Sequence, residues 1–123
     1  EIIIYGNGKQ TRDFVHVSDV SKSIIGALNA DIGEFRIINV GTGNGITIID
    51  LAERVQRFAL ESKLQVPKIT LSSVREGDVV HSIADLEGLD EIIEISSMTT
   101  LENGLEEQFL HGLGEIEGNK IGR

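Results

Sequence analysis

Two arginines, Arg12 and Arg75, have surroundings typical of anion-binding residues. Arg12 opens a β-type run directly after a glycine-containing polar loop, and Arg75 lies in the glycine-containing turn 75–78. A guanidinium presents a planar fork of donors that can grip phosphate oxygens at two points. Two such groups from separate loops could clamp a diphosphate. Each arginine also has an acidic neighbour, Asp13 or Asp78, so the spacing alone favours ordinary surface ion pairs.

The glycine-rich segment 41–45 lies between a strand-like run and a helix-like run, where a dinucleotide-binding loop would place a pyrophosphate. The third glycine of that fingerprint would fall at Ile46, and no Gly-Lys-Ser/Thr of a phosphate-binding loop follows. The pattern therefore favours a structural turn over a ligand contact.

The spacing of Asp13, His16 and Asp19 brings three metal-ligating residues together in sequence. In an extended strand Asp13 and His16 would point to opposite faces, so they could not share an ion. No cysteine is present, which excludes disulfides, zinc ribbons and thiol nucleophiles. We therefore predict no metal site.

Charge and hydropathy exclude further classes of protein. The 123 residues carry 11 Lys and Arg against 20 Asp and Glu, a net charge of −9, which is the wrong sign for binding nucleic-acid phosphates. No apolar run approaches the roughly 20 residues of a membrane helix, so we expect a cytoplasmic protein. The chain starts at Glu1 directly in the apolar run 2–4, which we interpret as the continuation of an upstream segment.

The first thirty or so residues predict two strands and a helix. Residues 2–5 and 12–17 are β-formers on either side of a polar loop. Ser18 is placed to cap a helix whose apolar stripe recurs at Val20, Ile24, Ala27 and Leu28.

The middle of the chain repeats this alternation. The run 35–40 is mostly apolar, as in a strand buried in a sheet. Thr47 with Asp50 resembles a capping box at the start of a helix. The apolar face of that helix contains Leu51, Val55, Phe58 and Ala59.

The last part is less regular. Residues 69–71 and 79–84 are candidate strands, while Asp85 and Thr100 are placed to cap short helices. Residues 112–123 are glycine-rich, which favours a flexible tail. The whole pattern is that of an α/β protein with one core.

Four blocks, in this order, resemble extended short-chain dehydrogenases acting on nucleotide sugars, the UDP-glucose 4-epimerase group. The first is IIIYGNGKQTRDFVHVSDVSKSI, which is similar to the family's Gly-Lys-Gln-Thr-Arg-Asp-Phe segment and the His/Tyr-Val-x-Asp-Val that follows it. Segment 39–43 resembles the family's Tyr-Asn-Ile-Gly strand end, 47–53 its helix start, and 75–85 its Arg-Pro-Gly-Asp and Ala-Asp blocks. Residues 86–98 depart from the family pattern, because they lack its Lys, Trp and Pro.

The resemblance implies an α/β fold, namely the C-terminal portion of a Rossmann-type extended short-chain dehydrogenase with the end of its parallel sheet and its substrate-binding lobe. We expect residues 1–111 to form this nucleotide-sugar-binding portion and residues 112–123 to form the flexible tail.

The resemblance also implies roles for five residues. Arg12 and Arg75 match the family's diphosphate-binding arginines, and Asp78 matches its aspartate that contacts the nucleotide ribose. Ile4 and Tyr5 match the strand that supplies contacts to the nucleobase.

The family's NAD site and its catalytic Tyr-x-x-x-Lys pair with a Ser/Thr lie upstream of the segment seen here. Tyr5 and Lys9 have the spacing of that pair, but the pair belongs on a helix, which Gly6-Asn7-Gly8 would break. We therefore predict no catalytic, cofactor-binding or metal-binding residue in this chain, which alone should be inactive.

The predicted function is nucleotide-sugar binding within an NAD-dependent epimerase such as UDP-glucose 4-epimerase, an isomerase of carbohydrate metabolism. The expected partners are a UDP-sugar and the missing N-terminal half of the enzyme. A 4,6-dehydratase, decarboxylase or reductase of the same family remains an alternative. So does a non-catalytic module that binds ligand or self-associates as a homo-oligomer through exposed sheet edges.

Overall fold

The computed structural model describes residues 1–31, 33 and 35–120, with side chains described as far as residue 112. Strands and α-helices alternate along it. The strands are β1 (Ile2–Tyr5), β2 (Thr11–Asp13), β3 (Gly45–Thr47), β4 (Ile69–Ser72) and β5 (His81–Ser82). The α-helices are α1 (Val17–Asn29), α2 (Ile48–Glu61) and α3 (Leu101–Lys120), and two short 3₁₀ turns cover Leu89–Glu91 and Ile95–Ser97.

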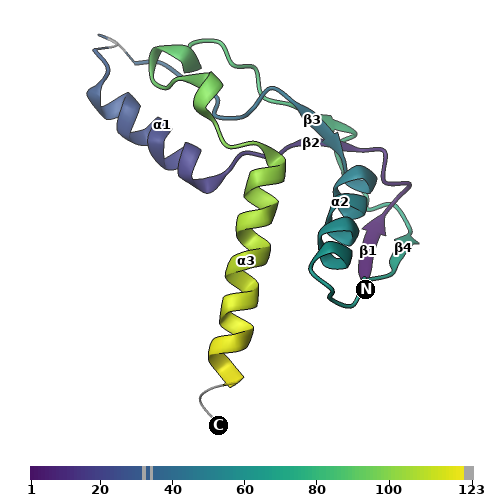
Figure 1. Cartoon of the computed structure of the whole chain (residues 1–123). Coiled ribbons are helices and arrows are strands. Elements are labelled where there is room, and N and C mark those ends of the chain that lie inside the picture. The colour runs from purple at the N-terminus through teal and green to yellow at the C-terminus, as the bar shows by residue number, and fades with distance from the viewer. Residues whose placement is uncertain (32, 34, 121–123) are drawn as a thin grey trace.

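The strands form two small sheets. In the first, β1 pairs with β4 in parallel, with Tyr5 opposite Ser72. In the second, β2 is central, antiparallel to β3 and parallel to β5. The expected α/β class with parallel strands is therefore confirmed. Figure 1 shows β1, β4 and α2 at one end of the molecule and α1 at the other, with α3 extending away from both.

Helix α2 begins as its sequence predicts. Thr47 Oγ1 accepts a hydrogen bond from the Asp50 backbone N–H at 3.1 Å, which satisfies one of the free donors of the first turn. The inner face of α2 contributes Ala52 and Ala59, each 4% exposed, to the same core as Ile4 of β1, which is 2% exposed. Phe58 then stacks on Phe109 of α3 with ring centroids 5.6 Å apart.

The start of α1 differs from the prediction. Strand β2 ends at Asp13 and does not continue to residue 17, and the N-cap of α1 is His16 rather than Ser18. The His16 ring accepts from the Ser18 backbone N–H at 3.3 Å. The hydroxyl of Ser18 instead hydrogen-bonds His16 Nδ1. A ring nitrogen of His16 thus caps α1 in place of the Ser18 hydroxyl that the sequence predicted.

The prediction of a strand over residues 35–40 is wrong, because these residues are irregular and mostly exposed. Phe35 and Ile37 are 90% and 82% exposed. An extended run becomes a strand only when a neighbouring strand takes up its backbone hydrogen bonds. In the described part of the chain, no strand pairs with residues 35–40.

The last part of the chain is more helical than predicted. Thr100 caps α3 as expected, since its Oγ1 accepts from the Asn103 backbone N–H at 3.2 Å. Asp85 caps only a turn, through Glu87 N, and the helix expected after it is the 3₁₀ turn Leu89–Glu91. Helix α3 continues through residues 112–120, which the sequence assigned to a tail, while residues 121–123 lie outside the described residues.

A helix that crosses a bilayer needs about 20 mostly apolar residues. Among the helices of the described chain, none is long and apolar enough to do so.

Candidate functional site

The five residues singled out in the sequence line one cavity of about 390 Å³. It lies between the end of β1, the start of β2, the first residue of α2 and the turn 75–78. Ile4, Tyr5, Arg12, Arg75 and Asp78 are separated by up to 74 positions in sequence, so the fold is what brings them together. Their role in binding stays a prediction.

Four further side chains and one glycine complete the lining. They are Ile3, Gln10, Ile48, Glu76 and Gly77. The sequence patterns assigned none of them a role, although all five stand inside the blocks that carry the family resemblance. Closeness in sequence to Arg12 or Arg75 was a signal that could have found Gln10, Glu76 and Gly77.

Ile4 and Tyr5 have different environments although they are neighbours in β1. Successive side chains of a strand point to opposite faces. Ile4 is buried in the core, while Tyr5 is half-buried and its ring lies under the guanidinium of Arg75. The distance from Arg75 Cζ to the ring centroid is 3.6 Å, which is a cation–π contact. Ile4 is therefore packed into the core beneath the cavity, whereas the Tyr5 ring lies in the lining beside Arg75.

Arg12 is fixed by two acceptors. Its Nη1 donates to the Thr11 backbone carbonyl at 2.7 Å, and its Nη2 pairs with Asp78 Oδ1 at 2.5 Å. Both partners of the pair are partly exposed, with 28% and 32% of their side-chain area accessible. Water and ligand oxygens can therefore reach the guanidinium, and an incoming anion would compete with Asp78 for it.

The turn that carries Arg75 and Asp78 closes through a backbone hydrogen bond from Asp78 N to Arg75 O at 3.3 Å. Gly77 stands at its third position with φ of +82°, the left-handed conformation that a type II turn requires and glycine adopts without strain. One tight turn thus presents a guanidinium and a carboxylate to the same cavity.

Asp13 does not pair with Arg12, its neighbour in sequence. Its carboxylate accepts from Thr42 N (2.9 Å), Thr42 Oγ1 (2.5 Å), Gly43 N (2.9 Å) and Ala84 N (3.2 Å). Burial acts to raise the pKa of Asp13, but these hydrogen bonds to the ionised form outweigh it and lower the pKa below its ordinary value. A Cβ on Gly41 would lie 2.7 Å from Asp13 Oδ2, so the close approach requires glycine. The glycine segment is a structural turn, as its sequence favours.

Asp19 joins α1 to the segment before α3, and His16 lies close to α3 itself. Asp19, 1% exposed, accepts from Lys22 Nζ at 2.8 Å and from the Thr99 backbone N–H at 2.7 Å. Burial acts to raise the pKa of Asp19, and these hydrogen bonds lower it on balance. Nε2 of His16 lies 3.5 Å from a carboxylate oxygen of Glu107. No group of three potential metal ligands occurs among the described residues.

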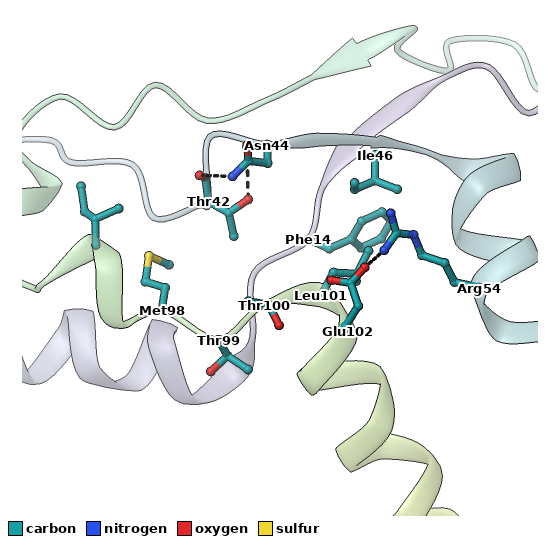
Figure 2. A pocket seen from close by; sticks show the side chains of 11 residues that line it. Phe14, Thr42, Asn44, Ile46, Arg54, Met98, Thr99, Thr100, Leu101 and Glu102 are labelled. Atoms are coloured by element: carbon teal, nitrogen blue, oxygen red, sulfur yellow. Dashed lines mark hydrogen bonds and ion pairs between the residues drawn. The ribbon is translucent and has the colours of Figure 1, made fainter. Parts of the chain in front are cut away.

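A second cavity, also of about 390 Å³, lies between the turn after residue 41, α2 and the start of α3 (Figure 2). Figure 2 shows two of its polar pairs: Asn44 Nδ2 donates to the Thr42 carbonyl, and Arg54 pairs with Glu102. Arg54 is the one cation among its lining residues. The cavity around Arg12 and Arg75 contains two cations, together with the carboxylates of Glu76 and Asp78.

The comparisons with known proteins agree on one family. Residues 1–41 match the sequence model of the NAD dependent epimerase/dehydratase family. The dTDP-L-rhamnose 4-epimerase of Burkholderia thailandensis is 31% identical over 85 residues, which are 69% of this chain and 22% of that enzyme.

Solved structures agree with this result. A UDP-glucose 4-epimerase from Thermotoga maritima, solved with UDP-glucose, superposes with a TM-score of 0.71 at 29% identity, covering 92% of this chain and 36% of that one. A UDP-glucuronic acid 4-epimerase from Bacillus cereus, in complex with UDP-glucuronic acid and NAD, gives a TM-score of 0.70 at 25% identity, covering 85% and 32%. The parallel α/β arrangement thus matches part of the Rossmann-type extended short-chain dehydrogenase fold. The chain spans about a third of the length of the relatives that it matches.

Proposed function

Because this chain belongs to the NAD-dependent epimerase/dehydratase family, we propose that it forms the nucleotide-sugar-binding part of an NAD-dependent nucleotide-sugar epimerase. The proposal rests on one observation above all. The residues that match the family's nucleotide contacts, far apart in sequence, line a single cavity that contains two guanidinium groups. Such an enzyme would act in cytoplasmic carbohydrate metabolism.

In the proposed complex the diphosphate lies between Arg12 and Arg75. The protein carries a net charge of −9, so the two forks of donors offset locally the repulsion that a diphosphate meets. The phosphate oxygens take the place of Asp78 at Arg12 Nη2, and the released carboxylate accepts from the ribose hydroxyls. The nucleobase lies against Tyr5 above the buried Ile4.

The glycine turn 41–45 does not fit the pyrophosphate of NAD. The glycine turn after residue 40 is the segment that most resembles a dinucleotide loop, yet the Thr42 and Gly43 amides already donate to Asp13. Amides engaged in this way have no N–H left for a pyrophosphate. We therefore assign the NAD site to another part of a longer enzyme, and no step of hydride transfer to this chain.

The proposed partner of this chain is that other part of the enzyme. One face of α1 and the run 35–40 leave Ile24, Leu28, Phe35 and Ile37 more than half exposed, an apolar surface of the kind that a second element covers. A 4,6-dehydratase, decarboxylase or reductase would use the same binding part, because the residues that select the reaction lie outside this chain.

Calorimetric titration with UDP, UMP and uridine tests the binding proposal. We expect affinity to fall in that order as phosphates are removed. Arg12→Ala and Arg75→Ala should each raise the Kd for UDP about tenfold, the effect of losing a charge-assisted hydrogen bond.

Arg57→Ala is the matched control, because Arg57 is exposed on α2 and lines neither cavity. Absence of UDP binding, or an equal loss of affinity in the Arg57 variant, would contradict the proposal.

A further inference from the structure

We infer that Gln10 is a positioning residue of this cavity: its side-chain amide fixes Tyr5, and the Tyr5 ring orients the guanidinium of Arg75. The inference concerns the geometry of the site, and its effect on ligand affinity rests on the proposed function. The role that we infer for Gln10 acts through Tyr5, because its side-chain amide is engaged with the Tyr5 carbonyl.

The first step is the hydrogen bond between Gln10 and Tyr5. Gln10 Nε2 donates to the backbone carbonyl of Tyr5 at 2.8 Å in a partly buried position. Tyr5 ends β1 of one sheet, whereas Gln10 precedes β2 of the other. Strands β1 and β2 are not paired, so this side-chain bond links the two sheets at the cavity.

The loop between Tyr5 and Gln10 has a fixed conformation, which holds the two residues in place relative to each other. Gly8 has a φ of +74°, and a Cβ there would lie 2.9 Å from the Ile49 Cβ. The loop also rests on the start of α2, because Ile48 N donates to Gln10 O and Ile49 N donates to Gly8 O, both at 3.0 Å. The backbone of Gln10 is therefore anchored to α2, and its amide holds Tyr5 relative to that anchor.

The second step is the stacking of Arg75 on Tyr5. Within the described residues Arg75 forms no ion pair, whereas Arg12 has both Asp78 and the Thr11 carbonyl. The Tyr5 ring, 3.6 Å from Arg75 Cζ, is thus the group that orients this guanidinium. A shift of the Tyr5 backbone would move the ring and Arg75 together.

The position of Gln10 in the lining agrees with this role. An adjoining cavity of about 560 Å³ shares Tyr5, Gln10 and Asp78 with the first one. Both partners of the Gln10–Tyr5 bond therefore line both cavities.

The chain contains a matched control for the hydrogen bond itself. Gln56 Nε2 donates to the Pro67 backbone carbonyl at 2.7 Å, also partly buried, and Gln56 lines neither cavity. Replacing either glutamine by methionine removes the same kind of bond with little change in side-chain length. Only one of the two replacements should reach Tyr5.

The composition supplies the probe. Tyr5 is the single tyrosine and there is no tryptophan, so the tyrosine band in near-ultraviolet circular dichroism reports on Tyr5 alone. Without ligand, Gln10→Met and Arg75→Met should each lose most of that band, because each frees the ring, whereas Gln56→Met should keep it. Gln10→Asn, which keeps the amide but shortens its reach, should behave like Gln10→Met and serves if the latter does not fold.

Binding then tests the consequence for the ligand. Gln10→Met should raise the Kd for UDP about three- to tenfold, the range for one lost hydrogen bond, and should add little in an Arg75→Met background. An unchanged tyrosine band in a folded Gln10 variant would overturn the inference. If the unmodified chain does not bind UDP, the proposed function fails, and the tyrosine band still decides the role of Gln10.

Discussion

Helix α2, at the end of the molecule that holds the cavity, and helix α1, at the other end, differ in the side chains that they bury: α2 buries Ala52 and Ala59, whereas α1 buries Asp19 and Ser23. Ile4 of β1 and Ala52 and Ala59 of α2 are almost fully buried where these two elements pack together. At the α1 end, Leu28 and Phe35 are 80% and 90% exposed. The two ends lie on opposite sides of the molecule in Figure 1.

An amphipathic sequence pattern shows that a helix has an apolar face, but it does not show that this face packs against other residues of the chain. Both α1 and α2 follow their apolar periodicity and both are capped. Most of a helix's stability in a protein comes from packing of its apolar face. The apolar face of α2 has such a contact within this chain, whereas α1 packs its Asp19 and Ser23 side within the chain and leaves Ile24 and Leu28 exposed for the partner that we propose.

The largest expected effect comes from truncating a buried side chain at the cavity end. Ile4→Ala should lower the free energy of unfolding by about 3 kcal/mol, because it removes buried methyl groups and leaves a cavity. Leu28→Ala should change it by less than about 0.5 kcal/mol, since Leu28 is exposed. Urea denaturation measures both. Equal losses in the two variants would mean that the α1 face is buried after all, for instance by self-association.

A somewhat smaller effect is expected at Asp13, which connects the two ends through the glycine turn. Asp13→Ala should cost about 2 kcal/mol of unfolding free energy, because it leaves the amides of Thr42, Gly43 and Ala84 without their acceptor. Asp31→Ala, at an exposed aspartate, is the control in the same urea experiment. A cost at Asp13 no greater than at Asp31 would contradict the connecting role.

The smallest expected effect is a gradual change of the free energy of unfolding with pH. The folded-state pKa values of Asp13 and Asp19 are both lowered, so the stability that they contribute is present above the unfolded pKa and is lost as pH falls below about 4. Unfolding free energy measured between about pH 6 and pH 3 should therefore decline, and Asp19→Asn should flatten the decline. If Asp19→Asn leaves the slope of unfolding free energy against pH unchanged, Asp19 does not contribute to this pH dependence.

Much of the cavity could be predicted because it is encoded in short, ordered motifs. The blocks around Arg12 and Arg75 point to both arginines, Asp78 and Tyr5 through their resemblance to the family's motifs. The cap at Thr47 and the apolar face of α2 were also predictable, since they depend on residues within one or two turns.

The partners of these residues were not predictable in the same way. The sequence offered Asp13 as the neighbour of Arg12, but Asp13 turns to the glycine segment while Arg12 pairs with Asp78, 66 positions away. The strand predicted over residues 35–40 fails for a related reason. Its apolar composition is local, whereas the neighbouring strand it needs is not present among the described residues.

The sequence by itself determined the family resemblance, the α/β alternation and the caps at Thr47 and Thr100, because each depends on residue type and short spacing. Through that resemblance it also supplied the prediction that Arg12 and Arg75 bind an anionic nucleotide. Only the tertiary structure decided that Arg12 meets Asp78, that Arg75 stacks on Tyr5, and that Gln10 links the two sheets. The physical reason is that a side chain's partner is set by the packing of segments distant in sequence. No local pattern records which of several acceptors will lie within hydrogen-bond distance.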